Sequence, residues 1–170
     1  MRHLTPENQS RRLNLIVLIV FGVAFGFVEA AVVYYLRALM RFHQNYEIFH
    51  YKVYLNLGFI TFVSPIHSLV VNNRISDIEV TREAATIVML ACVAFVAAKD
   101  WRRRLGAFLV TFGCWDLTYY LFLRIEDAWP RSLLTKDVFF LIPVTWIGPV
   151  ITPIVLSIVI VVLGAKFYTD

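Results

Sequence analysis

Four acidic residues lie within or beside the long apolar runs of this sequence: Glu29, Glu83, Asp116 and Asp137. A charged side chain at membrane depth costs roughly 3 kcal/mol on insertion scales, so such residues face the protein interior and are candidates for a functional site. At a helical rise of about 1.5 Å per residue, Glu29 and Glu83 lie about 24 Å and Asp116 about 18 Å from the same end of the spans. Asp137 falls at the outer mouth of the fourth span. We therefore expect the four acids to cluster in the outer half of a helical bundle.

The leading chemistry for such a cluster is the binding of a divalent metal ion or small ligand. Carboxylates from several helices of a bundle form the sites of di-iron and di-manganese proteins, usually together with histidines. The candidate metal ligands are the four acids and one histidine from the same side: Glu29, Glu83, Asp116, Asp137 and His67. Iron, manganese, zinc or copper would suit this set.

Three other uses of the acids stay open. Arg82 and Lys136 can neutralise the acids in supporting ion pairs, which suits a non-catalytic accessory or structural subunit of a larger membrane complex. Glu29, Glu83 and Asp116 could instead carry protons or ions across the membrane, or a lipid or quinone could bind among them. No nucleophile motif indicates a reaction class, so the sequence defines no catalytic or cofactor-binding residue and does not decide whether the protein is an enzyme.

Composition places the chain in the membrane class. Of its 170 residues 59% are hydrophobic and only 16% are charged, against about 25% charged in soluble domains. The net charge of +4 comes from basic residues at the ends of the apolar runs, which does not fit a nucleic-acid-binding face. We expect one transmembrane domain over residues 1–170 in contact with the lipid bilayer. Assembly into a homo-oligomer or a larger membrane complex is compatible with this composition.

The apolar runs predict an all-α fold. A span needs about 20 apolar residues, which gives four transmembrane helices over about 13–37, 78–98, 105–124 and 137–165. Prolines at 143, 149 and 153 predict a kink or a short half-helix in the last of these. Residues 50–71 are shorter, contain Asn56, Gly58 and Pro65, and are rich in strand-forming residues. A re-entrant or interfacial segment is favoured there over a fifth span.

Two pairs of segments indicate an internal repeat. "FGFVEAAVVYYLR" (25–37) matches "FGCWDLTYYLFLR" (112–124), and "TREAATIVML" (81–90) matches "TKDVFFLIPV" (135–144). Such a pattern is compatible with two parallel helix hairpins related by an axis along the membrane normal. The small residues one turn apart before Glu29 and Asp116 predict that both acids point at neighbouring helices.

Basic residues predict the orientation. Arg2, Arg11 and Arg12 precede the first span, the loop "KDWRRR" (99–104) joins the second and third, and Lys166 ends the fourth. Because cytoplasmic loops carry an excess of Lys and Arg, we expect both termini in the cytoplasm.

The segments "REAATIVML", "FGCWDLTYYLFLR" and "WPRSLLTKDVFFLIPVTWIGPVITP" resemble a family of small bacterial multi-pass membrane proteins that has no assigned activity. The resemblance covers roughly residues 21–157 and is weakest between 40 and 75. It implies a bacterial inner-membrane setting and transfers no functional residues.

Overall fold

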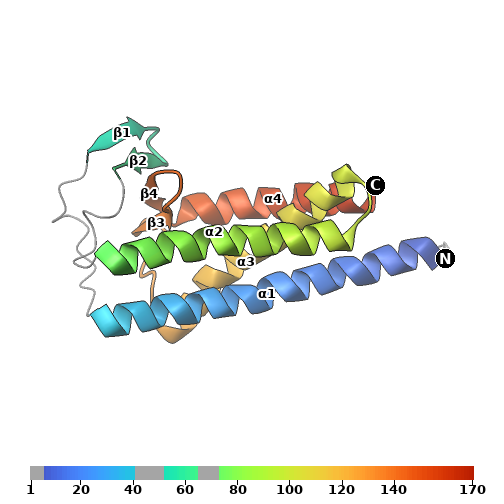
Figure 1. Ribbon diagram of the computed structural model, residues 1–170, viewed down its shortest axis with the longest axis horizontal. Coiled ribbons are helices and arrows are strands. Elements are labelled where there is room, and N and C mark those ends of the chain that lie inside the picture. Colours follow the sequence, from blue (N-terminus) through green and yellow to red (C-terminus); the bar gives the residue numbers. More distant parts are fainter. Residues whose placement is uncertain (1–5, 41–51, 65–72) are drawn as a thin grey trace.

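The computed structural model describes residues 6–40, 52–64 and 73–170. Within these ranges the chain forms four helices and a small sheet (Figure 1). Their order is α1 (Pro6–Met40), β1 (Val53–Asn56), β2 (Thr61–Val63), α2 (Asn73–Ala97), α3 (Trp101–Glu126), β3 (Lys136–Phe140), β4 (Thr145–Pro149) and α4 (Ile151–Thr169).

All four helices are long and apolar enough to cross a membrane. The spanning stretches are Gln9–Ala38, Asp77–Ala97, Trp101–Glu126 and Ile151–Thr169. The shortest has 19 residues, about 28 Å at the helical rise and close to the thickness of the hydrocarbon core. Many large apolar side chains on these helices are exposed, as expected for surfaces that face lipid. Among the described residues the chain thus has four helices able to span a membrane, as predicted, but the expectation of an all-α fold is wrong because the chain also forms a small antiparallel sheet.

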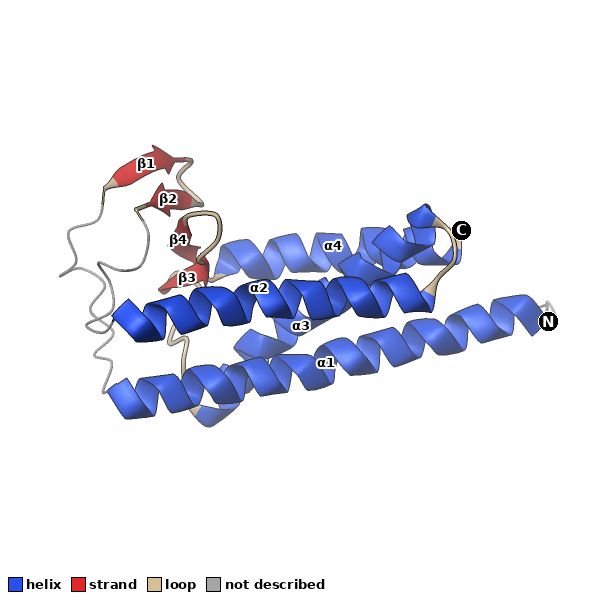
Figure 2. Cartoon of the chain, in the orientation of Figure 1, coloured by secondary structure: helices blue, strands red, loops and turns tan. Residues whose placement is uncertain are grey.

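The strands gather at one end of the helical bundle, which we call the sheet end (Figure 2). The start of α1 and the end of α4 lie at the opposite end of the bundle, which we call the terminal end (Figure 1). Both termini thus share one end of the bundle, the arrangement that four spans require.

The prediction of helix from residue 137 is wrong over the first part of the fourth apolar run. Residues 136–140 and 145–149 form an antiparallel hairpin instead, and α4 begins only at Ile151. The prolines explain the difference. Pro149 ends β4, and Pro153 lies in the first turn of α4, where a helix needs no N–H from it.

Residues 50–71, predicted as a re-entrant or interfacial segment, form a β-hairpin over residues 53–63, and the place of this hairpin relative to the membrane stays a prediction. The Asn56 side chain accepts a hydrogen bond from the Gly58 N–H, and Gly58 takes a positive φ of 84°, a conformation that glycine adopts without steric cost. The hairpin joins β4 through β2, giving one antiparallel sheet in the order β1-β2-β4-β3. Residues 50, 51 and 65–71, including His67, lie outside the described part of the chain.

The repeat is contradicted for one of its two pairs of segments. Residues 81–90 are helical in α2, whereas residues 136–140 of the matching segment form β3. Residues 25–37 and 112–124 are both helical, in α1 and α3.

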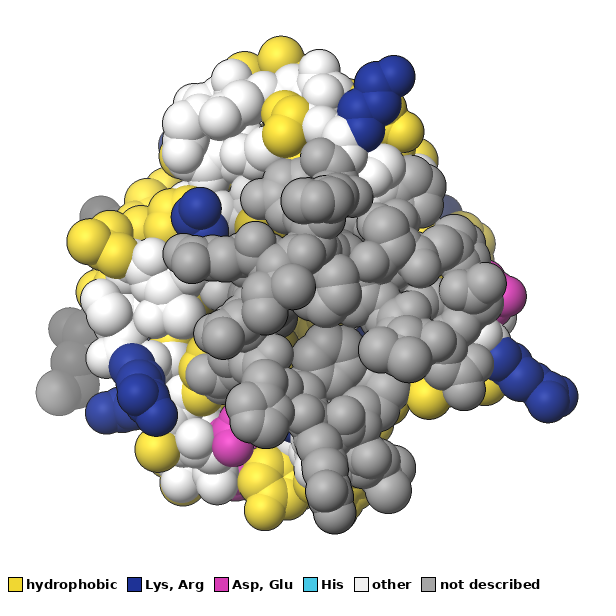
Figure 3. All heavy atoms as spheres, turned by 90° about the vertical axis from the view of Figure 1, so that its left-hand side faces the viewer, with side chains coloured by type: hydrophobic (Ala, Val, Ile, Leu, Met, Phe, Trp, Pro, Cys, Tyr) yellow, Lys and Arg dark blue, Asp and Glu magenta, His cyan; other side chains and the backbone are white. Residues whose placement is uncertain are grey.

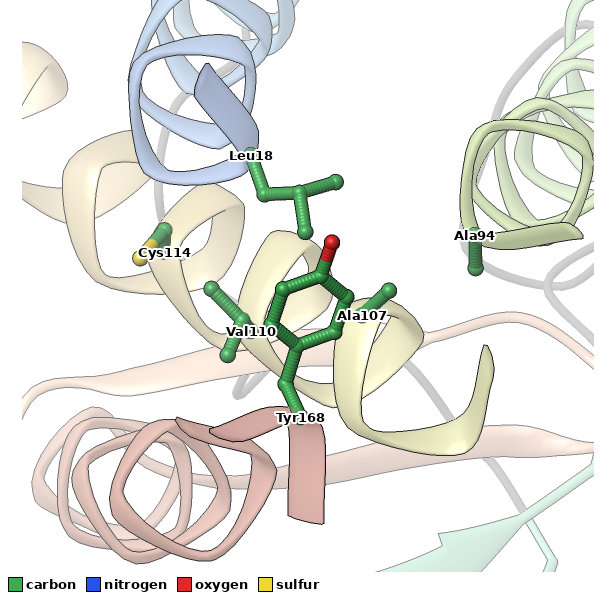
Figure 4. Packing of buried hydrophobic residues seen from close by; sticks show 6 residues of the cluster. All are labelled: Leu18, Ala94, Ala107, Val110, Cys114 and Tyr168. Carbon is green, nitrogen blue, oxygen red and sulfur yellow. The ribbon is translucent and has the colours of Figure 1, made fainter. Parts of the chain in front are cut away.

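Helix α3 is the centre of the bundle and packs against the other three helices. Near the terminal end, Leu18 of α1, Ala94 of α2 and Tyr168 of α4 converge on Ala107, Val110 and Cys114 of α3 (Figure 4). Glycines permit these close approaches. A methyl group at Gly26 of α1 would lie 2.8 Å from the carbonyl oxygen of Trp115, and one at Gly106 of α3 would lie 2.6 Å from the backbone nitrogen of Tyr168.

Candidate functional site

The predicted acids lie toward the sheet end, and each contacts a different partner. The first is Glu29 of α1. The Arg82 guanidinium of α2 donates through Nη1 to Glu29 Oε2 at 2.6 Å and through Nε to Glu79 Oε2 at 2.8 Å. The three side chains are 13–27% exposed, so both ion pairs are largely buried within the protein. Arg82 thus links α1 to α2, and Glu79, which is not among the predicted site residues, belongs to the same group.

Glu83 is bound to backbone rather than to Arg82. Its side chain leaves α2 toward the turn between β3 and β4, and the residue is 8% exposed. The backbone N–H of Leu141 donates to both carboxylate oxygens, at 3.1 and 3.0 Å, and that of Ile142 donates to Oε1 at 3.3 Å. Glu83 therefore accepts hydrogen bonds from two backbone N–H groups of the turn that do not take part in strand pairing. These bonds attach the sheet to α2.

Asp116 and Asp137 are each held by one hydroxyl. The Ser157 hydroxyl of α4 donates to Asp116 Oδ2 at 2.7 Å, which joins α3 to α4. The Tyr120 hydroxyl of α3 donates to Asp137 Oδ2 at 2.9 Å, which joins α3 to β3. The Asp116 carboxylate, as predicted, points at a neighbouring helix.

Asp137 is the acid of this set that lies outside the spanning segments, and it is 4% exposed. Burial raises the pKa of its carboxyl from 3.8 to about 6, although the positive charge of Arg37 and the hydrogen bond from Tyr120 act in the opposite direction. Burial disfavours the charged form because the carboxylate loses its hydration. Asp137 therefore titrates closer to neutral pH than an ordinary aspartate.

The structure does not gather the predicted acids into a metal-binding group. Within residues 6–40, 52–64 and 73–170, no three His, Cys, Asp or Glu side chains lie close enough to hold one ion. His67 is outside these ranges, and Lys136, predicted as an ion-pair partner, is exposed at the start of β3. The described acids bind Arg82, backbone N–H groups and hydroxyls instead, so a metal ion stays a prediction.

An aromatic cluster lies beside the Glu83 turn. Trp115 of α3 contacts Phe25 of α1, Phe112 of α3 and Phe140 of β3, with ring centroids 6.1, 5.3 and 6.3 Å away. Phe140 also contacts Trp146 of β4 at 5.9 Å. Since Phe140 immediately precedes Leu141, the aromatic cluster and the Glu83 carboxylate meet at the same turn.

Three buried polar atoms near this turn find no hydrogen-bond partner among the described residues: Trp115 Nε1, Trp146 Nε1 and Thr145 Oγ1. A buried donor without an acceptor costs about 1–3 kcal/mol, and such groups are few in native structures. Sequence reasoning missed all three. No sequence signal distinguishes a buried indole from an exposed one.

No protein-family model, curated protein or solved structure matches this chain. Its function must therefore be inferred from its own residues.

Proposed function

We propose that this membrane protein binds a small amphipathic ligand at the sheet end, where α1, α2 and α3 meet the turn between β3 and β4. The observation that carries the proposal is the Trp115 indole. The residue is 6% exposed, its ring lies among aromatic side chains of three elements, and its N–H has no acceptor within the described chain. A ligand oxygen would remove the cost of leaving this donor unpaired.

The surroundings favour a ligand with a polar head and an apolar body. Phe112, Trp115 and Phe140 offer ring surfaces. Glu83 at the adjoining turn, and the Arg82–Glu29 ion pair next to it in α2, supply charged groups. Ligand sites commonly combine aromatic walls with a few polar groups in this way.

The test is chemical analysis of the protein purified in particles of its own membrane lipids. Small molecules extracted from wild type, Trp115→Phe and Trp101→Phe are compared by mass spectrometry. Trp101 is 75% exposed at the terminal end, so its variant is the matched control. We expect one molecule near equimolar amount in wild type and control. Loss of one hydrogen bond of about 1.4 kcal/mol weakens binding about tenfold, so the amount recovered with Trp115→Phe should fall to about half or less. The same molecules in equal amounts in all three proteins would refute the proposal.

A second candidate function is that of a non-catalytic subunit in a larger membrane complex. It is supported by the structural role of the four predicted acids, each of which joins two elements of the fold and so needs no ligand as a partner: Glu29, Glu83, Asp116 and Asp137. Purification in a mild detergent distinguishes the two functions. A subunit should retain stoichiometric partner proteins, whereas a self-sufficient binding protein should migrate alone or as copies of itself.

The orientation forms part of the proposal. Arg11, Arg12 and the basic residues of the loop 99–104 lie near the terminal end, which favours that end as the cytoplasmic one. The sheet end would then face the outside. A bacterial inner membrane remains what the family resemblance implies.

A further inference from the structure

The β1–β2 hairpin presents large apolar side chains at its surface. In β1 and the turn that follows, Val53, Tyr54, Leu55, Leu57 and Phe59 are 48–54% exposed. Successive strand residues point to opposite faces, and all four residues of β1 are exposed, so the described part of the chain leaves both faces of this strand open. Exposed apolar patches of this kind mark surfaces that contact a partner or a membrane.

The hairpin is held firmly against the rest of the fold. Strand β2 pairs with β4 along its whole length, and Ile60 and Val63 are buried. The Thr152 hydroxyl in the first turn of α4 donates to the Phe59 carbonyl oxygen at 3.0 Å. The exposed apolar side chains are thus fixed relative to the outer turns of α4.

This attachment places the exposed side chains beside the apolar surface of α4. From Val155 onward, α4 exposes Val155, Leu156, Ile158 and Val159, side chains that face lipid in a spanning helix. Thr152, to which the Phe59 carbonyl is hydrogen-bonded, lies only three residues before Val155. The hairpin therefore continues the lipid-facing surface of α4 at the level where the span begins. Figure 1 shows β1 and β2 beside the start of α4, displaced to the side of the bundle.

We propose that β1 and its turn insert into the boundary between lipid headgroups and acyl chains beside α4. Tyr54 has an amphipathic ring of the kind enriched at this depth. Lys52, exposed at the base of β1, can extend its ammonium group toward lipid phosphates. The face seen in Figure 3 likewise carries Lys and Arg side chains next to hydrophobic ones at its rim. Water and headgroups at this level can satisfy the free backbone edge of β1, which the hydrocarbon core could not.

Site-directed spin labelling tests this placement in the full chain reconstituted into vesicles of phosphatidylcholine and phosphatidylglycerol. Cys92 and Cys114 are replaced by alanine, and single cysteines are introduced at Leu57, at Val159 as the lipid reference and at Lys99 as the aqueous reference. Leu57 and Val159 are 48% and 50% exposed, so their labels differ little in crowding. Collisions are measured with oxygen, which concentrates in lipid, and with a water-soluble nickel chelate.

We expect an oxygen-to-nickel collision ratio at Leu57 several-fold above that at Lys99 and below that at Val159. A ratio equal to that at Lys99 would place the hairpin in water and overturn the proposal. Low collision rates with both reagents would mean that a protein surface covers the hairpin, a second copy pairing at the β1 edge among them, and would overturn it too. Dilution of the protein in the vesicles should leave the expected ratio unchanged.

Discussion

Glu83 should hold the β3–β4 turn in place, and its replacement by alanine gives the sharpest test of the site's geometry. The substitution removes the acceptor of two backbone N–H groups, those of Leu141 and Ile142. Each donor left unpaired in a buried position costs about 1–3 kcal/mol. Removing the carboxylate also removes the cost of burying its charge, roughly 3 kcal/mol at membrane depth, and this offsets part of the destabilisation. We therefore expect a modest global destabilisation and a larger local effect at the turn.

Amide hydrogen exchange measures the local effect directly. An opening free energy lowered by about 1–3 kcal/mol accelerates exchange of the Leu141 and Ile142 amides roughly fivefold to a hundredfold. Glu83→Gln retains one acceptor oxygen and should lie between wild type and Glu83→Ala. Glu126→Ala, at an exposed position of the same end of the bundle, is the control and should leave the turn protected. Unchanged exchange of residues 141 and 142 in Glu83→Ala would refute the role assigned to this carboxylate.

Four further predictions concern helix packing, the titration of Asp137, metal binding and proton movement. Gly106→Ala places a methyl group 2.6 Å from the Tyr168 backbone nitrogen and should destabilise the protein by about 1–3 kcal/mol, seen as a lower midpoint of thermal unfolding than that of Leu105→Ala. Because the folded-state pKa of Asp137 is raised from 3.8 to about 6, folding binds a proton there, and the free energy of unfolding should fall as pH rises through this interval; denaturant titrations should show a smaller fall in Asp137→Asn, and an equal one would contradict the shift. If a divalent metal binds, elemental analysis should find it at stoichiometric amount in wild type and lose it in Glu83→Ala and Asp116→Ala, while its absence after metal-replete expression would rule out that ligand. Proton translocation through the acids predicts flux in liposomes that Glu29→Gln abolishes, and flux equal in both proteins would exclude a role for Glu29.

The sequence predicted the spans because lipid leaves few options. An apolar run of about 20 residues in a bilayer must satisfy its own backbone hydrogen bonds, and a helix is the structure that does so within one segment. The glycines before Glu29 could be assigned a role for the same reason, since small residues one turn apart define a helix face. Gly22 and Gly26 do pack against α3, and Glu29 meets Arg82 of α2.

The hairpins could not be predicted from their own residues. A strand needs a partner, and β4 pairs with β2, which lies more than 80 positions earlier in the chain. Residues 136–149 are as apolar as a helical span, so periodicity alone left helix as the simpler assignment. Only the fold shows that the backbone N–H groups of the β3–β4 turn find their acceptor in Glu83.

What the sequence by itself determined is the membrane class, the four apolar segments able to span a bilayer and the acids withdrawn from lipid, because each follows from the local cost of placing a peptide group or a charge in a bilayer. The tertiary structure decided the partner of each of the four predicted acids. Glu83 binds a turn, Asp116 a serine, Asp137 a tyrosine, and Glu29 an arginine. A carboxylate can accept hydrogen bonds from any of these donors, so the choice among them depends on which elements the fold brings within about 3 Å, the length of a hydrogen bond.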